Sequence, residues 1–181
     1  DSRSSFLLKE LWKPGLIINL TLFMEMCKLD KNFRTLWKNY VLQSFLATLA
    51  MSIVLIFLSI EHAVIVASIG ATSFIVFAMP RSVTARPRNV IGGHMIGLLC
   101  GSLSTLIPHP PSINVIMYSI AVGLSIFLMI ITNTEHPPAS GTALGVAING
   151  FHPNVALAVI VSAVTLSAIH YSLRKYLKDL V

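Results

Sequence analysis

Six apolar stretches, separated by short polar ones, fill the chain from residue 41 to residue 173. They cover residues 41–60, 62–79, 90–107, 113–132, 136–150 and 154–173. A helix that crosses a bilayer needs about 20 residues, with a range of roughly 17–25. The first, fourth and sixth stretches meet that length easily and the second and third narrowly, whereas the fifth is short and rich in small residues. The pattern predicts an all-α, polytopic bundle of membrane helices.

A further apolar run, residues 14–29, precedes these stretches, but it contains Glu25 and is short for a crossing. We expect an amphipathic helix that lies at the membrane interface. A helix packed against the bundle outside the membrane would give the same pattern. The chain is therefore divided into an N-terminal amphipathic region, residues 1–38, and a transmembrane domain, residues 39–181.

Composition supports the membrane assignment. Charged residues make up 11% of the chain, well below the roughly one quarter that is usual in soluble domains. Between residues 39 and 173 the charged side chains are Glu61, Arg81, Arg86, Arg88 and Glu135. Such a segment cannot cover its surface with charge, so its expected partner is the lipid bilayer.

The basic residues predict the orientation. The net charge is +6, and the Lys and Arg residues gather before the first stretch, within residues 81–88 and within residues 174–178. Six crossings place all three groups, and both termini, on the inner side, as the positive-inside rule requires. Four spans with two re-entrant segments would keep the same arrangement. Basic groups that flank apolar runs do not form a nucleic-acid-binding stripe, so no nucleic acid is expected.

The two halves of this domain echo each other. Glu61-His62 ends the first apolar stretch and Glu135-His136 ends the fourth, and small residues follow each pair, at 68–73 and at 139–143. With three crossings in each half, the echo predicts a 3+3 inverted repeat, as in many transporters. The packing needs of membrane helices could also produce it.

Three motifs carry a family resemblance: GATSFIVFAMP at residues 70–80, ARPRNVIGGH at 85–94 and EHPPA at 135–139. Their order and spacing resemble the HPP family of integral membrane proteins, from about residue 49 onward. The resemblance implies a bundle usually described with four spans. It also implies nitrite transport, which is associated with members from chloroplasts and cyanobacteria, and hence a bacterial inner membrane or a plastid envelope. The chain departs from the family pattern at Arg81 and at Ala139-Ser140-Gly141.

The His-Pro-Pro triplet predicts where an anion could bind. Proline is tolerated in the first turn of a helix, so the triplet should begin a helix rather than break one. Exposed amides at that helix start would favour an anion. The predicted binding residues are His136, Pro137, Pro138, Ser140, Gly141 and Thr142, with Gly70, Thr72 and Ser73 facing them. Small residues of this kind also serve close helix packing.

Ionisable residues at membrane depth are costly and point to function. Glu135 with His136 or His94 could couple a proton to anion movement. Alternatively, Glu135 could form a structural clamp with Arg86 or Arg88, near Asn89 of the same motif. The three basic residues Arg81, Arg86 and Arg88 could attract anions to the inner face, or they could simply set the topology. We predict no metal site and no cofactor.

The functional prediction is a transporter or channel for a small inorganic anion, nitrite being the expected substrate. The alternative is a structural or regulatory subunit of a larger membrane complex. The sequence shows no serine–base pair and no paired carboxylates at depth, so an enzyme is not expected. A chain this small is expected to assemble as a homo-oligomer or within a membrane complex.

Overall fold

A computed structural model describes residues 33–57 and 63–181 of the chain. The chain separates into two units, Asp1–Trp37 and Lys38–Val181, and the second holds the features described below. The predicted amphipathic helix at residues 14–29 lies outside the described residues.

The described part of the chain is helical, with no strand among its residues, and it contains six α-helices. They are α3 (Phe33–Phe57), α4 (Ala63–Ala78), α5 (Pro87–Leu106), α6 (Asn114–Ile131), α7 (Pro138–Asn149) and α8 (Pro153–Leu173). Two short 3-10 turns, η2 (Val83–Ala85) and η3 (Pro111–Ile113), precede α5 and α6. The six apolar stretches of the sequence thus each correspond to one helix.

Proline marks the start of three of these helices. Pro87, Pro138 and Pro153 each occupy a first-turn position, of α5, α7 and α8 respectively. The first N–H groups of a helix have no partner within it, so proline loses nothing there, and its fixed φ suits the helix. The prediction that His136-Pro137-Pro138 opens a helix is confirmed.

Helix lengths constrain which elements cross a membrane. Within residues 33–57 and 63–181, three helical segments are long and apolar enough to do so, Pro87–Leu106, Pro111–Ile131 and Pro153–Leu173, and Val64–Ala78 is a shorter apolar helix. At about 1.5 Å per residue, the 12 residues of α7 extend roughly 18 Å, less than the hydrocarbon thickness of about 30 Å. Helix α7 is therefore too short to cross by itself, and the six-crossing topology stays a prediction.

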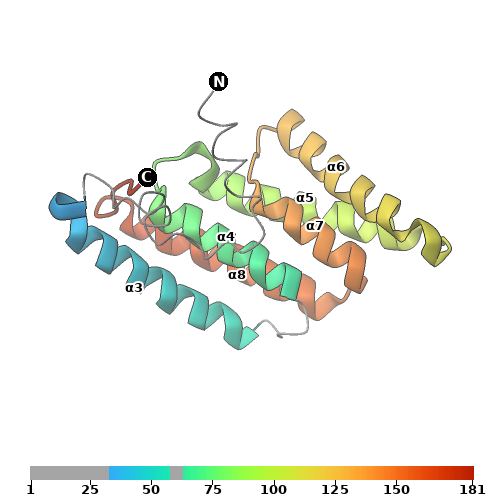
Figure 1. Ribbon diagram of the computed structural model, residues 1–181, viewed down its shortest axis with the longest axis horizontal. Helices are drawn as coiled ribbons and strands as arrows, with labels where there is room; N and C mark the ends of the chain where they lie inside the picture. Colours follow the sequence, from blue (N-terminus) through green and yellow to red (C-terminus); the bar gives the residue numbers. More distant parts are fainter. Residues whose placement is uncertain (1–32, 58–62) are drawn as a thin grey trace, which may run out of the picture. The chain divides into compact units, whose positions relative to one another are not determined.

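Helix α7 lies among longer helices. It packs against α5, α4 and α6, while α8 packs against both α5 and α4 (Figure 1). The core between α4, α5 and α8 is built from Ile65, Ile69, Val90, Val159 and Leu166, each fully buried. Helix α3 adds Ala50 to this core.

A glycine face lets α5 approach α7 closely. A Cβ at Gly93 would lie 2.7 Å from His136 Cβ, and a Cβ at Gly97 would collide with the carbonyl oxygen of Ala139. Gly101 continues this face, one turn further along the helix, against Ala143. Small residues at helical spacing allow this approach in membrane bundles.

The segment after α8 returns to the first helix. Gln43 of α3 is buried, and its side-chain amide donates to the carbonyls of Phe77 and, over 2.8 Å, of Lys178. The Lys178 N–H donates to Gln43 Oε1, and the Leu180 N–H donates to the Ala78 carbonyl. These bonds satisfy a polar side chain in an otherwise apolar helix.

Gly97→Ala is expected to destabilise the protein by about 1–3 kcal/mol, because the added methyl group overpacks a backbone contact. The thermal unfolding midpoint in detergent measures the effect. Gly123→Ala on α6 is the matched control, because nothing lies within 4 Å of its added Cβ. Equal midpoints for the two variants would contradict the close approach of α5 and α7.

Candidate functional site

A continuous chain of hydrogen-bonded polar groups lies buried between α4, α5 and α7. We call it the buried polar chain. Its side chains are nearly inaccessible, with Ser68 at 5%, Thr72 at 0%, His94 at 1%, His136 at 0% and Thr142 at 0% exposure. In order, the chain runs from the Pro138 carbonyl through Ser68, Thr142, His94, Thr72 and His136 to the Thr84 carbonyl.

The first half of the buried polar chain joins the start of α7 to α5. The Ser68 hydroxyl donates to the Pro138 carbonyl over 2.5 Å and lies 2.9 Å from Thr142 Oγ1. Thr142 Oγ1 in turn lies 2.8 Å from His94 Nδ1. Thr142 is one turn into α7, so its hydroxyl faces both α4 and α5.

The second half of the buried polar chain joins α5, through Thr72 of α4 and then His136, to the η2 turn that precedes α5. His94 Nε2 lies 2.9 Å from Thr72 Oγ1, and Thr72 Oγ1 lies 2.9 Å from His136 Nε2. His136 Nδ1 donates to the Thr84 carbonyl over 2.8 Å. The two imidazole rings are 5.2 Å apart, centre to centre. Thr72 thus bridges the two histidines.

The hydrogens of this chain can be followed from its ends. Carbonyl oxygens only accept, so Ser68 gives its hydrogen to Pro138 and His136 Nδ1 gives one to Thr84. Ser68 can then only accept from Thr142, and Thr142 can only accept from His94 Nδ1. A neutral His94 has no second hydrogen, so Thr72 must donate to His94 Nε2.

One hydrogen is then missing. Thr72 has given its hydrogen to His94, so the contact between Thr72 and His136 Nε2 requires a second hydrogen on His136. The buried polar chain is therefore complete only when it holds one more proton than two neutral histidines supply. The Ser68 carbonyl, 3.1 Å from Thr72 Oγ1, competes for the same hydroxyl hydrogen. With two neutral histidines, the contact between Thr72 Oγ1 and His136 Nε2 therefore lacks a hydrogen.

The predicted binding residues divide into two sets. His136, Thr142 and Thr72, with His94, belong to the buried polar chain. The other members lie beside it. Ser140 donates to the carbonyl of Pro137, and Gly141 packs against Ser68. Ser73 is buried, its hydroxyl without a partner in the described structure, and Gly70 is half-buried with open space around it.

The amides at the start of α7 are not bare. The Ala139 N–H donates to the His136 carbonyl over 2.9 Å, and the Ser140 N–H donates to the Pro137 carbonyl over 3.2 Å. Pro137 and Pro138 have no N–H to offer. The expectation of exposed amides was wrong here, because the chain folds into a tight first turn that uses them. The hydrogen donors that remain among the predicted binding residues are hydroxyls and imidazoles.

Side chains at the start of α5 bond backbone carbonyls near Glu135, instead of the Glu135 carboxylate that the predicted clamp would use. Asn89 donates from Nδ2 to the Glu135 carbonyl over 3.1 Å, and Arg88 donates from Nη2 to the Thr132 carbonyl over 3.0 Å. Among the described residues, no ion pair joins the Glu135 carboxylate to Arg86 or Arg88. The start of α5 is thus bonded to the backbone that leads into α7.

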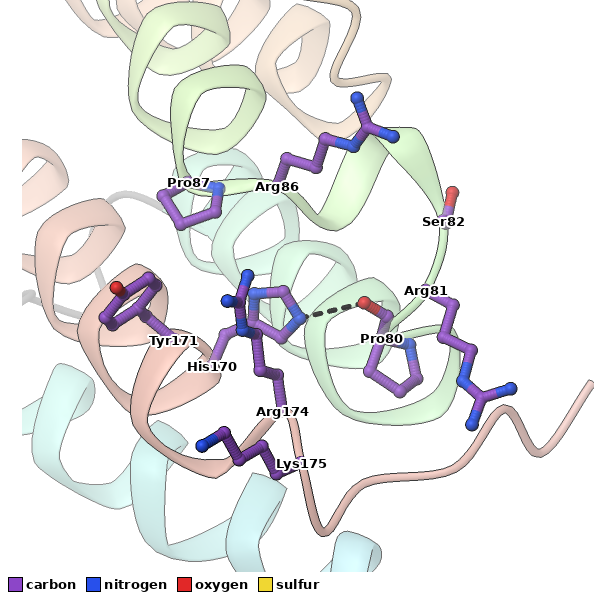
Figure 2. A pocket seen from close by; sticks show the side chains of 9 residues that line it. All are labelled: Pro80, Arg81, Ser82, Arg86, Pro87, His170, Tyr171, Arg174 and Lys175. Carbon is purple, nitrogen blue, oxygen red and sulfur yellow. Dashed lines mark hydrogen bonds between the residues drawn. The ribbon is translucent and has the colours of Figure 1, made fainter.

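Arg86 lies away from the buried polar chain, on the wall of a cavity that we call the basic cavity. This cavity has a volume of about 420 Å³ and is lined by residues from the end of α4, the start of α5 and the end of α8 (Figure 2). The sequence interpretation missed His170, Arg174 and Lys175 of this lining, because they follow an apolar stretch and are explained by topology alone. No group of three or more metal-ligating side chains is present in the described parts of the chain.

Thr142→Val is expected to destabilise the protein by about 1–3 kcal/mol, because it leaves the buried His94 Nδ1–H without an acceptor. Thr48→Val is the matched control, since Thr48 is exposed on α3 and bonds only a carbonyl of its own helix. Thermal unfolding of both variants in the same detergent measures the difference. A Thr142→Val protein that unfolds like the control would contradict the buried polar chain.

Comparison with known proteins agrees with this architecture. Two transmembrane proteins of Dictyostelium discoideum are similar to the chain. One is 38% identical over 48% of this chain and 31% of its own length, and the other is 29% identical over 57% and 34%. The chain therefore spans about a third of these relatives. No solved structure matches it.

The family described as "HPP, transmembrane region" matches residues 31–176. The match includes all six described helices and the segments that contribute to the buried polar chain. The protein therefore belongs to the HPP family of integral membrane proteins.

Proposed function

We propose that this protein moves a small inorganic anion across the membrane, with nitrite as the substrate, and that a proton moves with it. The buried polar chain is the observation that carries the proposal. Polar and ionisable groups inside a membrane protein are costly and are kept for function. A chain of hydroxyls and imidazoles that is one hydrogen short can hold an added proton among all its members.

The hydrogen-bonding groups of the buried polar chain suit an anion. A nitrite ion accepts hydrogens and donates none, so it can replace an accepting carbonyl at either end of the chain. The added proton gives the chain one positive charge, and an anion beside it restores neutrality. Uptake of both together avoids the cost of placing an isolated charge in an apolar interior.

The position of α7 supports the same proposal. Short helices that begin inside a bundle are where many transporters place their substrate sites. Helix α7 begins at Pro138 and is enclosed by α4, α5 and α6. The choice of nitrite itself rests on the resemblance to family members associated with nitrite transport, since hydroxyls and imidazoles would accept other small anions too.

A second function is favoured by the outer face of α6. Val115, Phe127 and Ile131 are exposed by 75%, 58% and 61%. Such a face suits lipid, and it equally suits another helix in a larger complex. As a structural or regulatory subunit, the protein would co-purify with other membrane chains from its native membrane and would show no flux when reconstituted alone.

Purified protein in liposomes is expected to carry nitrite at a rate well above that of protein-free liposomes. His136→Gln should lower this rate about tenfold or more, because it removes the group that accepts the added proton. His109→Gln is the matched control, since His109 lies in the loop between α5 and α6 and bonds a local carbonyl. Colorimetric nitrite assay of the liposome contents gives the rate.

Wild-type protein that is folded but carries no nitrite or other small anion would overturn the transport proposal. Equal rates for the two histidine variants would show that the buried polar chain is not the route. Both variants are first compared by thermal unfolding, so that loss of folding is not mistaken for loss of transport.

Coupling to protons predicts a dependence on the pH gradient. An imposed gradient with the alkaline side inside should raise initial nitrite uptake severalfold, because the anion enters with a proton. His94→Gln should abolish this increase. Protein-free liposomes under the same gradient measure the passage of the neutral acid, which is subtracted. Uptake that responds to membrane voltage alone would contradict proton coupling.

A further inference from the structure

The basic cavity is a built site that anion transport does not require. It lies where α4 ends, α5 begins and α8 ends, with a volume of about 420 Å³. Four cationic side chains from these elements line it: Arg81, Arg86, Arg174 and Lys175 (Figure 2). None of the described residues that line it is acidic.

The charge of the cavity is only partly offset by the protein. Asp179 lies 4.0 Å from Arg81 Nε and accepts a hydrogen bond from the Arg81 N–H. Arg174 lies over the Tyr171 ring, 4.9 Å from its centre. Within the described residues, Arg86, Arg174 and Lys175 have no ion-pair partner. Several like charges held around one cavity favour an anionic ligand that bridges them.

A buried nitrogen in the same cavity lacks a partner. His170 is 4% exposed, and its Nε2–H donates to the Pro80 carbonyl over 2.9 Å, as the dashed line in Figure 2 shows. Its other ring nitrogen, Nδ1, is buried and has no partner in the described structure. Buried polar atoms are nearly always hydrogen-bonded. With its hydrogen on Nε2, Nδ1 of the neutral ring can only accept, so a ligand would satisfy it through a hydroxyl group such as that of a headgroup glycerol, whereas a doubly protonated ring would donate to an anion.

The position of the cavity indicates its ligand. It lies at the start of α5 and the end of α8, two helices long and apolar enough to cross a membrane. Tyr171, 63% exposed on its wall, is typical of the level where lipid headgroups meet the protein. Basic pockets between membrane helices at this level bind anionic headgroups.

We propose that the basic cavity binds a phosphate group, supplied by the headgroup of an acidic phospholipid. Arginine side chains match phosphate oxygens in pairs, and Arg86, Arg174 and Lys175 would have to turn their long side chains towards one phosphate to do so here. The volume exceeds that of a three-atom anion many times over, since one water occupies about 30 Å³. A phosphate with its glycerol fills it better. This inference does not depend on the transport proposal.

The full chain, purified in a neutral detergent, is tested with phosphatidylglycerol and with phosphatidylcholine by native mass spectrometry. Phosphatidylglycerol should stay bound at one lipid per chain, about tenfold more tightly than phosphatidylcholine. Arg86→Gln and Arg174→Gln should each weaken this binding by a similar factor. Lys178→Gln is the matched control, because it removes one positive charge from the same segment but does not line the cavity.

A second experiment, with inorganic phosphate, tests whether the bound phosphate group belongs to a lipid headgroup or to free phosphate. If millimolar phosphate raises the unfolding midpoint of lipid-free protein, and Arg174→Gln abolishes this rise, the cavity takes free phosphate. No rise, together with retained phosphatidylglycerol, identifies the lipid headgroup. Lys175→Gln replaces either arginine variant that fails to fold.

Three results would overturn the proposal: equal lipid binding by the wild type and both arginine variants, an equal loss for Lys178→Gln, or no binding of either phosphate source. All are binding measurements, so they are independent of whether nitrite flux is found.

Discussion

Helix α5 approaches α7 and the segment before it along Gly93, Gly97 and Gly101, where α5 contributes no side chain to the contact. This contact fixes the depth at which His94 meets Thr142, and it places the start of α7 against the middle of the bundle. If the two helices stood one side chain further apart, the Thr142 hydroxyl would no longer reach His94 Nδ1, and that buried nitrogen would lose its partner. Close packing and buried polarity in this protein are therefore parts of one arrangement.

The helices could be predicted because their signals are local. Runs of apolar residues, and prolines at the first turns of α5, α7 and α8, act within a few residues of their own position. The same holds for the small residues of α5, whose spacing alone indicates one packed face. His94, His136, Thr72 and Thr142 were also recognisable as unusual, because polar residues are rare in such runs.

The connections among these residues could not be predicted. Thr72 bridges two histidines that are far from it in sequence, and the Thr84 carbonyl belongs to a turn that has no sequence signal. The prediction of exposed amides at the start of α7 failed for a different reason. A helix start normally leaves free amides, but here the first turn folds back on the carbonyls of His136 and Pro137. Such a turn depends on backbone geometry that residue types do not specify.

The bond between Gln43 and Lys178 has a consequence for biogenesis. The two residues are 135 positions apart, and Gln43 lies in an early helix whose neighbours are apolar. During synthesis this amide can meet the Phe77 carbonyl first, whereas its bonds to the Lys178 backbone can form only after residues 178–180 have left the ribosome. The position of α3 is therefore completed late, although α3 is made before the other five described helices.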